Sequence, residues 1–116
     1  MKNTLLLITL IATFHVANAQ TVNFDSEDGL EAAAELYMSH PKSAPFIVLF
    51  HQAGWSRGEY EEIAPKLNKM GYNCLAVDLR SGGEVNNVRN ITKQNAVKGM
   101  KETEYVHSLP DMRSAI

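Results

Sequence analysis

The chain has 116 residues, carries 11 basic and 13 acidic side chains for a formal charge of −2, and contains one cysteine. This length allows one small domain. The near-neutral balance and the lack of any lysine and arginine cluster argue against a nucleic-acid partner or an anionic membrane surface, and a single cysteine rules out an intrachain disulfide framework.

The first 19 residues have the pattern of a secretory signal peptide. Lys2 gives a positive start, residues 4–14 are an almost unbroken apolar run, and Ala17-Asn18-Ala19 matches the small-x-small cleavage pattern. The run is roughly half of the ~20 residues that span a bilayer, so we favour cleavage over the alternative, a retained anchor. We expect residues 20–116 to form a secreted or periplasmic protein with no membrane anchor.

The first structural element expected in the mature chain is a β-hairpin. Residues 20–24 alternate apolar and polar side chains as a half-buried strand does, and Asp28-Gly29 is a strong tight-turn signal. Residues 30–38 also suit a helix, because residues 31–36 are helix formers. The turn and the alternation favour a strand, and the helix stays open as the alternative.

A strand is expected at residues 46–50 and another at residues 72–79, after a polar, proline-containing loop at residues 39–45. Residues 46–50 are a continuous apolar run, which is typical of a parallel strand covered on both faces, and residues 72–79 contain the apolar run 74–77 of a second buried strand. Together with the helix expected between them, they form a strand-helix-strand unit with a right-handed connection.

The intervening helix is expected to span about residues 59–70. Ser56 and Glu59 have the spacing of a capping box, and Gly71 stands where a left-handed residue ends a helix. Pro65 interrupts the helix, which leaves open a break into two short turns around it. A single apolar stripe along the helix is expected from five residues: Tyr60, Ile63, Ala64, Leu67 and Met70.

Residues 84–107, which follow a turn at residues 80–83, are expected to be mostly loop, because they are polar and lack a sustained period. Ser108 and Asp111 repeat the serine-x-x-acid cap with Pro110 near the helix start, so a new helix is expected from Ser108. Because a natural domain rarely stops about two turns into a helix, we expect the chain to be truncated at Ile116.

Two strand-end motifs carry a family resemblance. Residues 49–54 (Leu-Phe-His-Gln-Ala-Gly) and residues 75–83 (Leu-Ala-Val-Asp-Leu-Arg-Ser-Gly-Gly) flank the helix, and with the order of elements over residues 22–116 the chain resembles the α/β-hydrolase superfamily. The nearest members are dienelactone-hydrolase-like and esterase-like. The resemblance implies an α/β fold in which the hairpin, residues 46–50 and residues 72–79 are the first four strands. The helix at Ser108 would precede the nucleophile strand.

The resemblance also implies an activity and a site. In such hydrolases backbone N–H groups stabilise the oxyanion of acyl transfer from an ester or related small carbonyl substrate. The Ala53 N–H is the candidate donor, and Gln52, which stands where the family has glycine, is the weaker candidate. Gly-x-Ser-x-Gly has no match, so nucleophile, acid and base would lie outside this chain, which alone is expected to be inactive. No cofactor is implied.

Several other polar residues are expected to be structural. His51 is more plausible as a packed histidine than as the general base, Asp78 is expected to form a corner with Arg80, and His40 and His107 are expected at the surface. No group of residues has metal-ligand spacing.

Expectations also follow for four further residues. Cys74 is expected to be buried. Lining a substrate pocket is one interpretation of both Trp55 and Tyr60, and packing in the core is favoured for Tyr60. Asn90-Ile91-Thr92 fits a glycosylation acceptor.

Two other classes of protein stay open. A non-catalytic, hydrolase-like binding protein is favoured if the natural chain ends at Ile116, because function lies in the site and not in the fold. A nucleotide-binding module is suggested by Asp78, which lies about twenty residues beyond a glycine-bearing loop. Gly54-x-x-x-Gly58 is not the Gly-x-Gly-x-x-Gly of that class.

Overall fold

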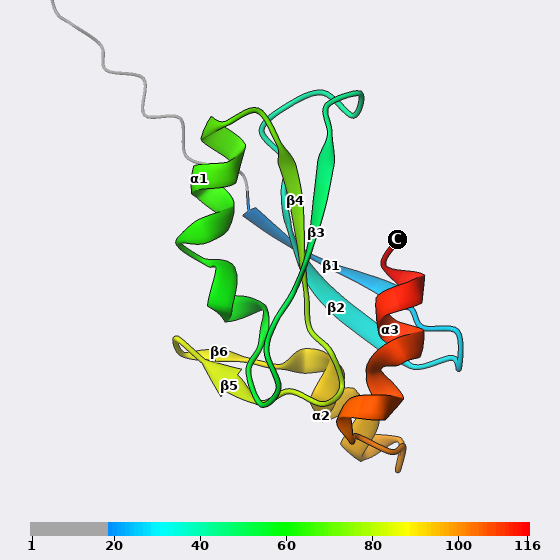
Figure 1. The fold of residues 1–116 in the computed structure, drawn as a ribbon. Coiled ribbons are helices and arrows are strands. Elements are labelled where there is room, and N and C mark those ends of the chain that lie inside the picture. The colour runs from blue at the N-terminus through cyan, green and yellow to red at the C-terminus, as the bar shows by residue number, and fades with distance from the viewer. Residues whose placement is uncertain (1–18) are drawn as a thin grey trace, which may run out of the picture.

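A mixed four-stranded sheet in the order β1-β2-β4-β3 forms the centre of the computed structural model, which describes residues 19–116 (Figure 1). Its strands are β1 (Ala19–Asp25), β2 (Glu31–Tyr37), β3 (Phe46–Phe50) and β4 (Asn73–Val77). β2 is antiparallel to both β1 and β4, whereas β3 and β4 are parallel. The predicted signal peptide lies, except for Ala19, outside the described residues.

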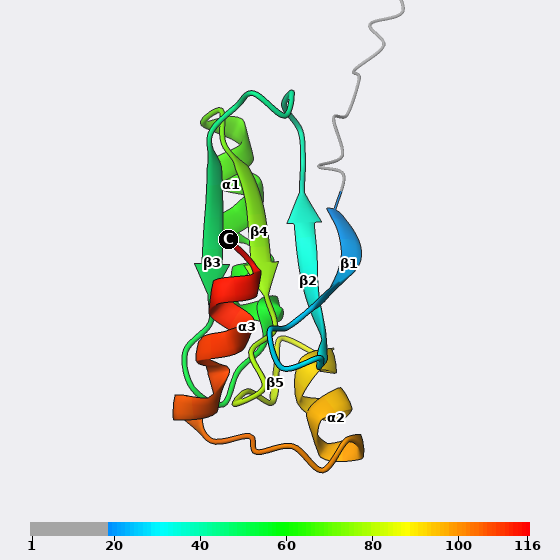
Figure 2. The same cartoon turned by 90° about the vertical axis from the view of Figure 1, so that its right-hand side faces the viewer.

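Helices cover both faces of this sheet (Figure 2). α1 (Ile63–Lys69) packs on the face that carries Ile47 and Leu49, and α3 (Leu109–Ser114) packs on the face that carries Val48 and Phe50. α2 (Ile91–Lys98) lies against β2. Within the described part of the chain, no helix has the length and apolar character needed to cross a membrane.

The predicted β-hairpin is confirmed, and the strand alternative for residues 30–38 is the correct one. Every residue of β1 has a partner in β2, from Ala19 with Tyr37 to Asp25 with Glu31. Gly29 has φ +80° in the connecting turn, which glycine adopts without steric cost. Ala32, Ala33 and Ala34 are fully buried, so packing between β1, β4 and α2 outweighs the helix propensity of these alanines.

The β3-α1-β4 unit forms as predicted, with two differences in burial. β3 is half-exposed and lies at the edge of the described sheet, with Phe46 45% exposed, so the expected cover on both faces is incomplete. The predicted apolar stripe is wrong at Ile63 and Met70, which are exposed, whereas Asn68 is buried. The Asn68 side chain donates hydrogen bonds to the carbonyl oxygens of Tyr37 and Tyr72, which accounts for its burial.

The helical segment is divided, but not around Pro65. A 3-10 turn, η1 (Arg57–Tyr60), precedes α1, and Pro65 lies in the first turn of α1, where its missing N–H leaves no helical hydrogen bond unmade. Ser56 caps η1 as predicted, because its hydroxyl accepts from the Gly58 N–H. The reciprocal half of the capping box is wrong, since the Glu59 carboxylate accepts from the Gln52 N–H at 2.9 Å. Gly71 has φ +100°, as predicted for the helix end.

Residues 84–107 are more regular than the predicted loop. β5 (Glu84–Val85) and β6 (Val88–Arg89) form a short hairpin, in which Asn86 and Asn87 both have positive φ, as a two-residue primed turn requires. The hairpin leads into α2, whose buried residues are only Thr92 and Ala96. Such short strands and so weak an apolar face leave no periodicity to detect.

The last helix begins where predicted, although its cap differs. A 3-10 turn, η2 (Tyr105–Ser108), runs into α3, and Pro110 lies in the first turn of α3 as expected. The Ser108 hydroxyl does not cap the helix and instead donates to the Ser81 hydroxyl at 2.8 Å. Ser108 therefore ties α3 to the turn after β4.

Candidate functional site

The candidate site lies at the carboxyl ends of the parallel strands β3 and β4. The chain leaves β3 toward α1 on one face of the sheet, and after β4 it reaches α3 on the opposite face (Figure 2). Ligands of open α/β sheets bind where adjacent connections diverge in this way. The loop of residues 51–55 and the turn of residues 79–83 meet there.

His51 fixes the start of the 51–55 loop. Its ring is buried, Nε2 accepts the Leu79 N–H at 2.8 Å, and Nδ1 lies 2.8 Å from the Gln52 carbonyl oxygen. With Nε2 an acceptor, Nδ1 carries the proton and donates to Gln52. Both ring nitrogens are thus used within the protein, which is the structural role expected of His51.

The two candidate oxyanion residues differ in what their backbone N–H groups do. The Gln52 N–H donates to Glu59 Oε2 at 2.9 Å, so only the exposed Gln52 side chain is available to a ligand. Ala53 is exposed, and among residues 19–116 its N–H has no hydrogen-bond acceptor. Gly54 with φ +83° and a Trp55 N–H to Gln52 carbonyl bond of 3.2 Å close the turn around it.

Asn90 joins the loop to its neighbours, a role that the sequence did not reveal. The Asn90 side-chain amide donates to the carbonyl oxygens of Leu79 at 2.8 Å and Trp55 at 3.2 Å, while its Oδ1 accepts the Lys93 N–H and caps α2. Asn90 is 2% exposed. Because its amide is buried and bonded, it is no glycosylation acceptor in the folded protein. No sequence signal marked this role, because the apolar face of α2 is too weak to reveal the helix that Asn90 caps.

Asp78 pairs with Arg57 and not with Arg80, so the predicted Asp78–Arg80 corner is wrong. The fully buried Asp78 carboxylate accepts from Arg57 Nη1 and from the Arg57 backbone N–H, each at 2.7 Å, and from the Ile91 N–H at 2.8 Å. Arg57 also bonds Glu35 at 3.3 Å. Both oxygens of Asp78 are therefore occupied, which argues against the ribose-binding role of a nucleotide module.

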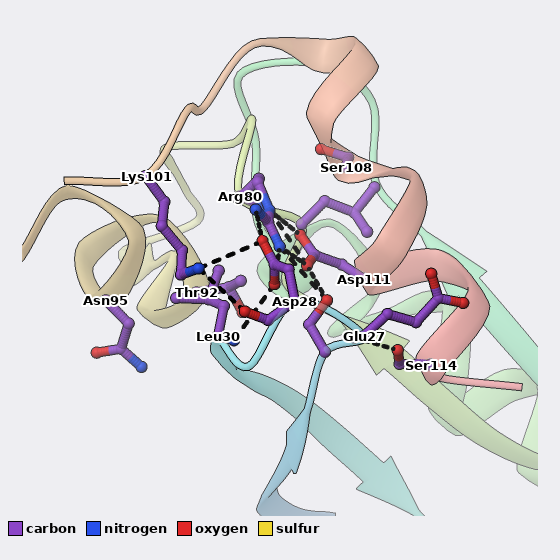
Figure 3. A network of polar contacts seen from close by, with 12 residues as sticks. Glu27, Asp28, Leu30, Arg80, Thr92, Asn95, Lys101, Ser108, Asp111 and Ser114 are labelled. Carbon is purple, nitrogen blue, oxygen red and sulfur yellow. Dashed lines mark hydrogen bonds and ion pairs between the residues drawn. The ribbon is translucent and has the colours of Figure 1, made fainter. Parts of the chain in front are cut away.

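Arg80 instead joins the hairpin turn to α3 (Figure 3). Its guanidinium bonds Asp111 at 2.6 Å and Asp28 at 2.7 Å, and its backbone N–H bonds Asp111 at 3.1 Å. The hydrogen bonds from Arg80 hold the pKa of Asp28 well below its usual range, and the bond to Asp28 raises the pKa of Arg80. Both shifts favour the charged pair. The ion pairs of Arg80 therefore connect the turn of residues 80–83 to the hairpin turn at Asp28 and to α3 at Asp111.

The remaining candidates take no part in a catalytic arrangement. His40 and His107 are partly buried, so they are less exposed than predicted. His40 Nε2 contacts the Asn68 carbonyl oxygen, and His107 Nδ1 is a buried atom with no hydrogen-bond partner among residues 19–116. Cys74 is buried as predicted, and its burial raises the pKa of the thiol. In the portion that the structure describes, no cluster of three or more histidine, cysteine or acidic residues is placed to bind a metal.

Tyr60 and Trp55, the two aromatic residues near the candidate site, differ in their exposure. The Tyr60 hydroxyl donates to the Phe50 carbonyl oxygen at 2.6 Å and its ring packs in the core, as predicted. Trp55 is 38% exposed at the end of the 51–55 loop. An open depression of about 420 Å³ lies beside Arg80, His107 and Leu109 and contains no residue of the 51–55 loop.

Comparisons with protein-family profiles and with curated proteins gave no match for this chain.

Proposed function

We propose that this chain is the N-terminal part of an exported α/β-hydrolase-type enzyme. It acts on an ester or related small carbonyl substrate by nucleophilic acyl transfer, and its nucleophile, acid and base lie outside residues 1–116. The observation that carries the proposal is the exposed Ala53 N–H, unbonded among the described residues, at the carboxyl end of a parallel strand. Export rests on the signal-peptide pattern of residues 1–19.

The arrangement of helices supports a site at this loop. α1 carries the chain from β3 to β4 on one face of the sheet, and α3 lies on the opposite face. Because crossovers between parallel strands are right-handed in about 98% of cases, a helix on the opposite face carries the chain back in the other direction. A parallel strand following α3 would then lie beyond β3, with its carboxyl end beside the loop of residues 51–55.

The chemistry that this placement suits is stabilisation of an oxyanion. When a nucleophile attacks the substrate carbonyl carbon, the carbonyl π electrons move to oxygen, and the negative charge needs preorganised donors. The Ala53 N–H supplies one donor at a loop held by His51 and Trp55. By the resemblance to α/β-hydrolases, the second donor follows the nucleophile. In this proposal the exposed Gln52 side chain contacts the substrate.

The test is turnover of a chromogenic ester by the full-length natural protein, which carries the nucleophile in this proposal, and by two variants of that protein at Ala53. Ala53→Pro removes the proposed donor, whereas Ala53→Gly keeps the N–H and is the matched control. Losing one such donor lowers kcat by about 10²–10³. A folded Ala53→Pro protein with unchanged kcat would reject the role of Ala53. A folded natural protein that binds small carbonyl compounds without hydrolysing them would favour the binding-protein alternative.

A further inference from the structure

The tip of the 51–55 loop, Ala53 and Gly54, is held by hydrogen bonds at both ends. At the first end, His51 Nε2 accepts the Leu79 N–H. At the second end, the Trp55 carbonyl oxygen accepts from the Gly83 N–H at 2.8 Å and from the Asn90 side-chain amide at 3.2 Å. The position of the Ala53 N–H is therefore set by groups that come from the segment after β4.

Asn90 contacts both ends of this loop and the segment that holds it. Its N–H donates to the Gly83 carbonyl oxygen, its carbonyl oxygen accepts the Gln94 N–H, and its Oδ1 accepts the Lys93 N–H. Its amide nitrogen bonds the Leu79 and Trp55 carbonyl oxygens and lies 3.3 Å from His51 Nε2. All four polar groups of this buried residue are engaged, so its side chain has one orientation.

We infer that Asn90 is a positioning residue, which holds the Trp55 carbonyl oxygen and the His51 ring so that the Ala53 N–H faces the reacting carbonyl oxygen. This inference rests on the proposed function, because it assigns Asn90 to the loop that carries the proposed oxyanion donor. Asn90 does not touch the substrate. It acts through the backbone of residues 51–55, and its other hydrogen-bonding groups belong to α2 and Gly83.

The expected effect is on rate and not on substrate binding. A misplacement of about 1 Å in a catalytic group costs about 10² in rate. Without the Asn90 donors, the Trp55 carbonyl oxygen keeps only the bond from Gly83, and the Leu79 carbonyl oxygen loses its side-chain partner. The tip would gain freedom, and the Ala53 N–H would no longer be held in one position.

Asn90→Asp is the sharpest variant, because it keeps the acceptor that caps α2 while it replaces the donors by an oxygen facing two carbonyl groups. Thr92→Val is the matched control. Thr92 lies on the same helix, is fully buried, and its hydroxyl accepts the Ala33 N–H at 2.9 Å, away from the 51–55 loop. Both variants lose buried hydrogen bonds of α2, but only Asn90→Asp changes the loop.

Ester turnover by the natural protein gives the first readout. Asn90→Asp should lower kcat about 10²-fold with KM nearly unchanged, whereas Thr92→Val should retain the kcat of the natural protein. In an Ala53→Pro background, Asn90→Asp should have little further effect, because the donor that it positions is already gone. A full, multiplicative loss in that background would overturn the inference, since it would show that Asn90 does not act through Ala53.

Amide hydrogen exchange gives a second readout that needs no activity. Asn90→Ser keeps a capping oxygen but is too short to reach Trp55, and it should speed exchange of the Gln52 and Trp55 N–H groups more than Thr92→Val does. Unchanged exchange, or folded Asn90 variants with the kcat of the natural protein, overturns the inference and leaves the hydrolase proposal standing. A natural protein without hydrolase activity overturns both. Loss of folding in both Asn90 variants would assign Asn90 a purely structural role.

Discussion

Gly82 lies so close to Trp55 that a β-carbon at position 82 would overlap the Trp55 carbonyl oxygen. The same β-carbon would collide with the Asn90 amide nitrogen and stand 2.7 Å from His51 Cε1. Glycine is thus the residue that lets the turn after β4 contact the 51–55 loop.

Gly82→Ala is expected to destabilise the natural protein by about 3 kcal/mol, because backbone and buried groups have to shift to admit the methyl group. Gly99→Ala is the control, since a β-carbon at position 99 has no contact shorter than 3.4 Å and its φ is −81°. The control should change stability by less than ~1 kcal/mol. Urea unfolding of both variants is the measurement, and equal stability would contradict the contact seen here.

Arg80→Met is expected to cost about 3–5 kcal/mol, because it leaves the fully buried Asp111 carboxylate without its cation. Asp111→Leu should cost less, since the Arg80 guanidinium keeps its ion pair with Asp28. The double variant should be more stable than the sum of the two losses predicts, because no Asp111 carboxylate is then left buried without its cation. A strictly additive double variant in urea unfolding would show that the two charges do not stabilise each other.

The Arg80–Asp28 pair predicts a loss of stability in acid. The folded pKa of Asp28 is lowered, first by its hydrogen bonds from Arg80, so the unfolded chain binds a proton more readily than the folded one. The contribution of Asp28 is therefore present above about pH 4 and is lost as the pH falls below that value. Asp28→Asn should flatten the dependence of the unfolding free energy on pH between about pH 4 and pH 2.

Asp25→Asn is the control for this acid dependence, because Asp25 is exposed and has no ion pair among residues 19–116. Asp25→Asn should leave the dependence of the unfolding free energy on pH unchanged. An Asp28→Asn protein that keeps the full acid dependence would mean that other carboxylates account for it.

The sequence predicted the elements whose signals are local, and it missed the contacts made between distant segments. The turn at Gly29, the apolar runs of β3 and β4, and Gly71 after α1 all lie where expected. The partner of Asp78 was predicted from its neighbour Arg80, but the partner is Arg57, 21 residues away. Ion pairs of this kind depend on how elements pack, which no local pattern encodes.

The candidate site was predictable only where a motif marks it. Residues 51–54 stood out because a parallel strand ends there, whereas Asn90 stood in a polar stretch without periodicity. The structure places Asn90 beside Trp55 because the β5–β6 hairpin returns the chain to the ends of β3 and β4 (Figure 1). The conflict between turn and helix signals in residues 30–38 was resolved by burial of Ala32, Ala33 and Ala34.

Processing at the N-terminus is the prediction that tests export. Cleavage between Ala19 and Gln20 should give a mature protein that begins at Gln20, unmodified or cyclised to pyroglutamate. Gln20 pairs with Leu36, so such cleavage removes only the first residue of β1. Mass analysis of the N-terminal peptide from secreted material is the measurement. A mature protein that still begins at Met1 would reject the signal-peptide assignment.

The strand order β1-β2-β4-β3 also determines how the chain behaves while it is being made. β1 and β2 are adjacent in sequence and can pair early, but the sheet neighbour of β3 among the described strands is β4. A nascent chain therefore carries the apolar run Phe46–Phe50 without a pairing partner until residue 77 has emerged. Unpaired apolar strands of this kind aggregate. We expect this run to be the segment that a holding chaperone binds before export.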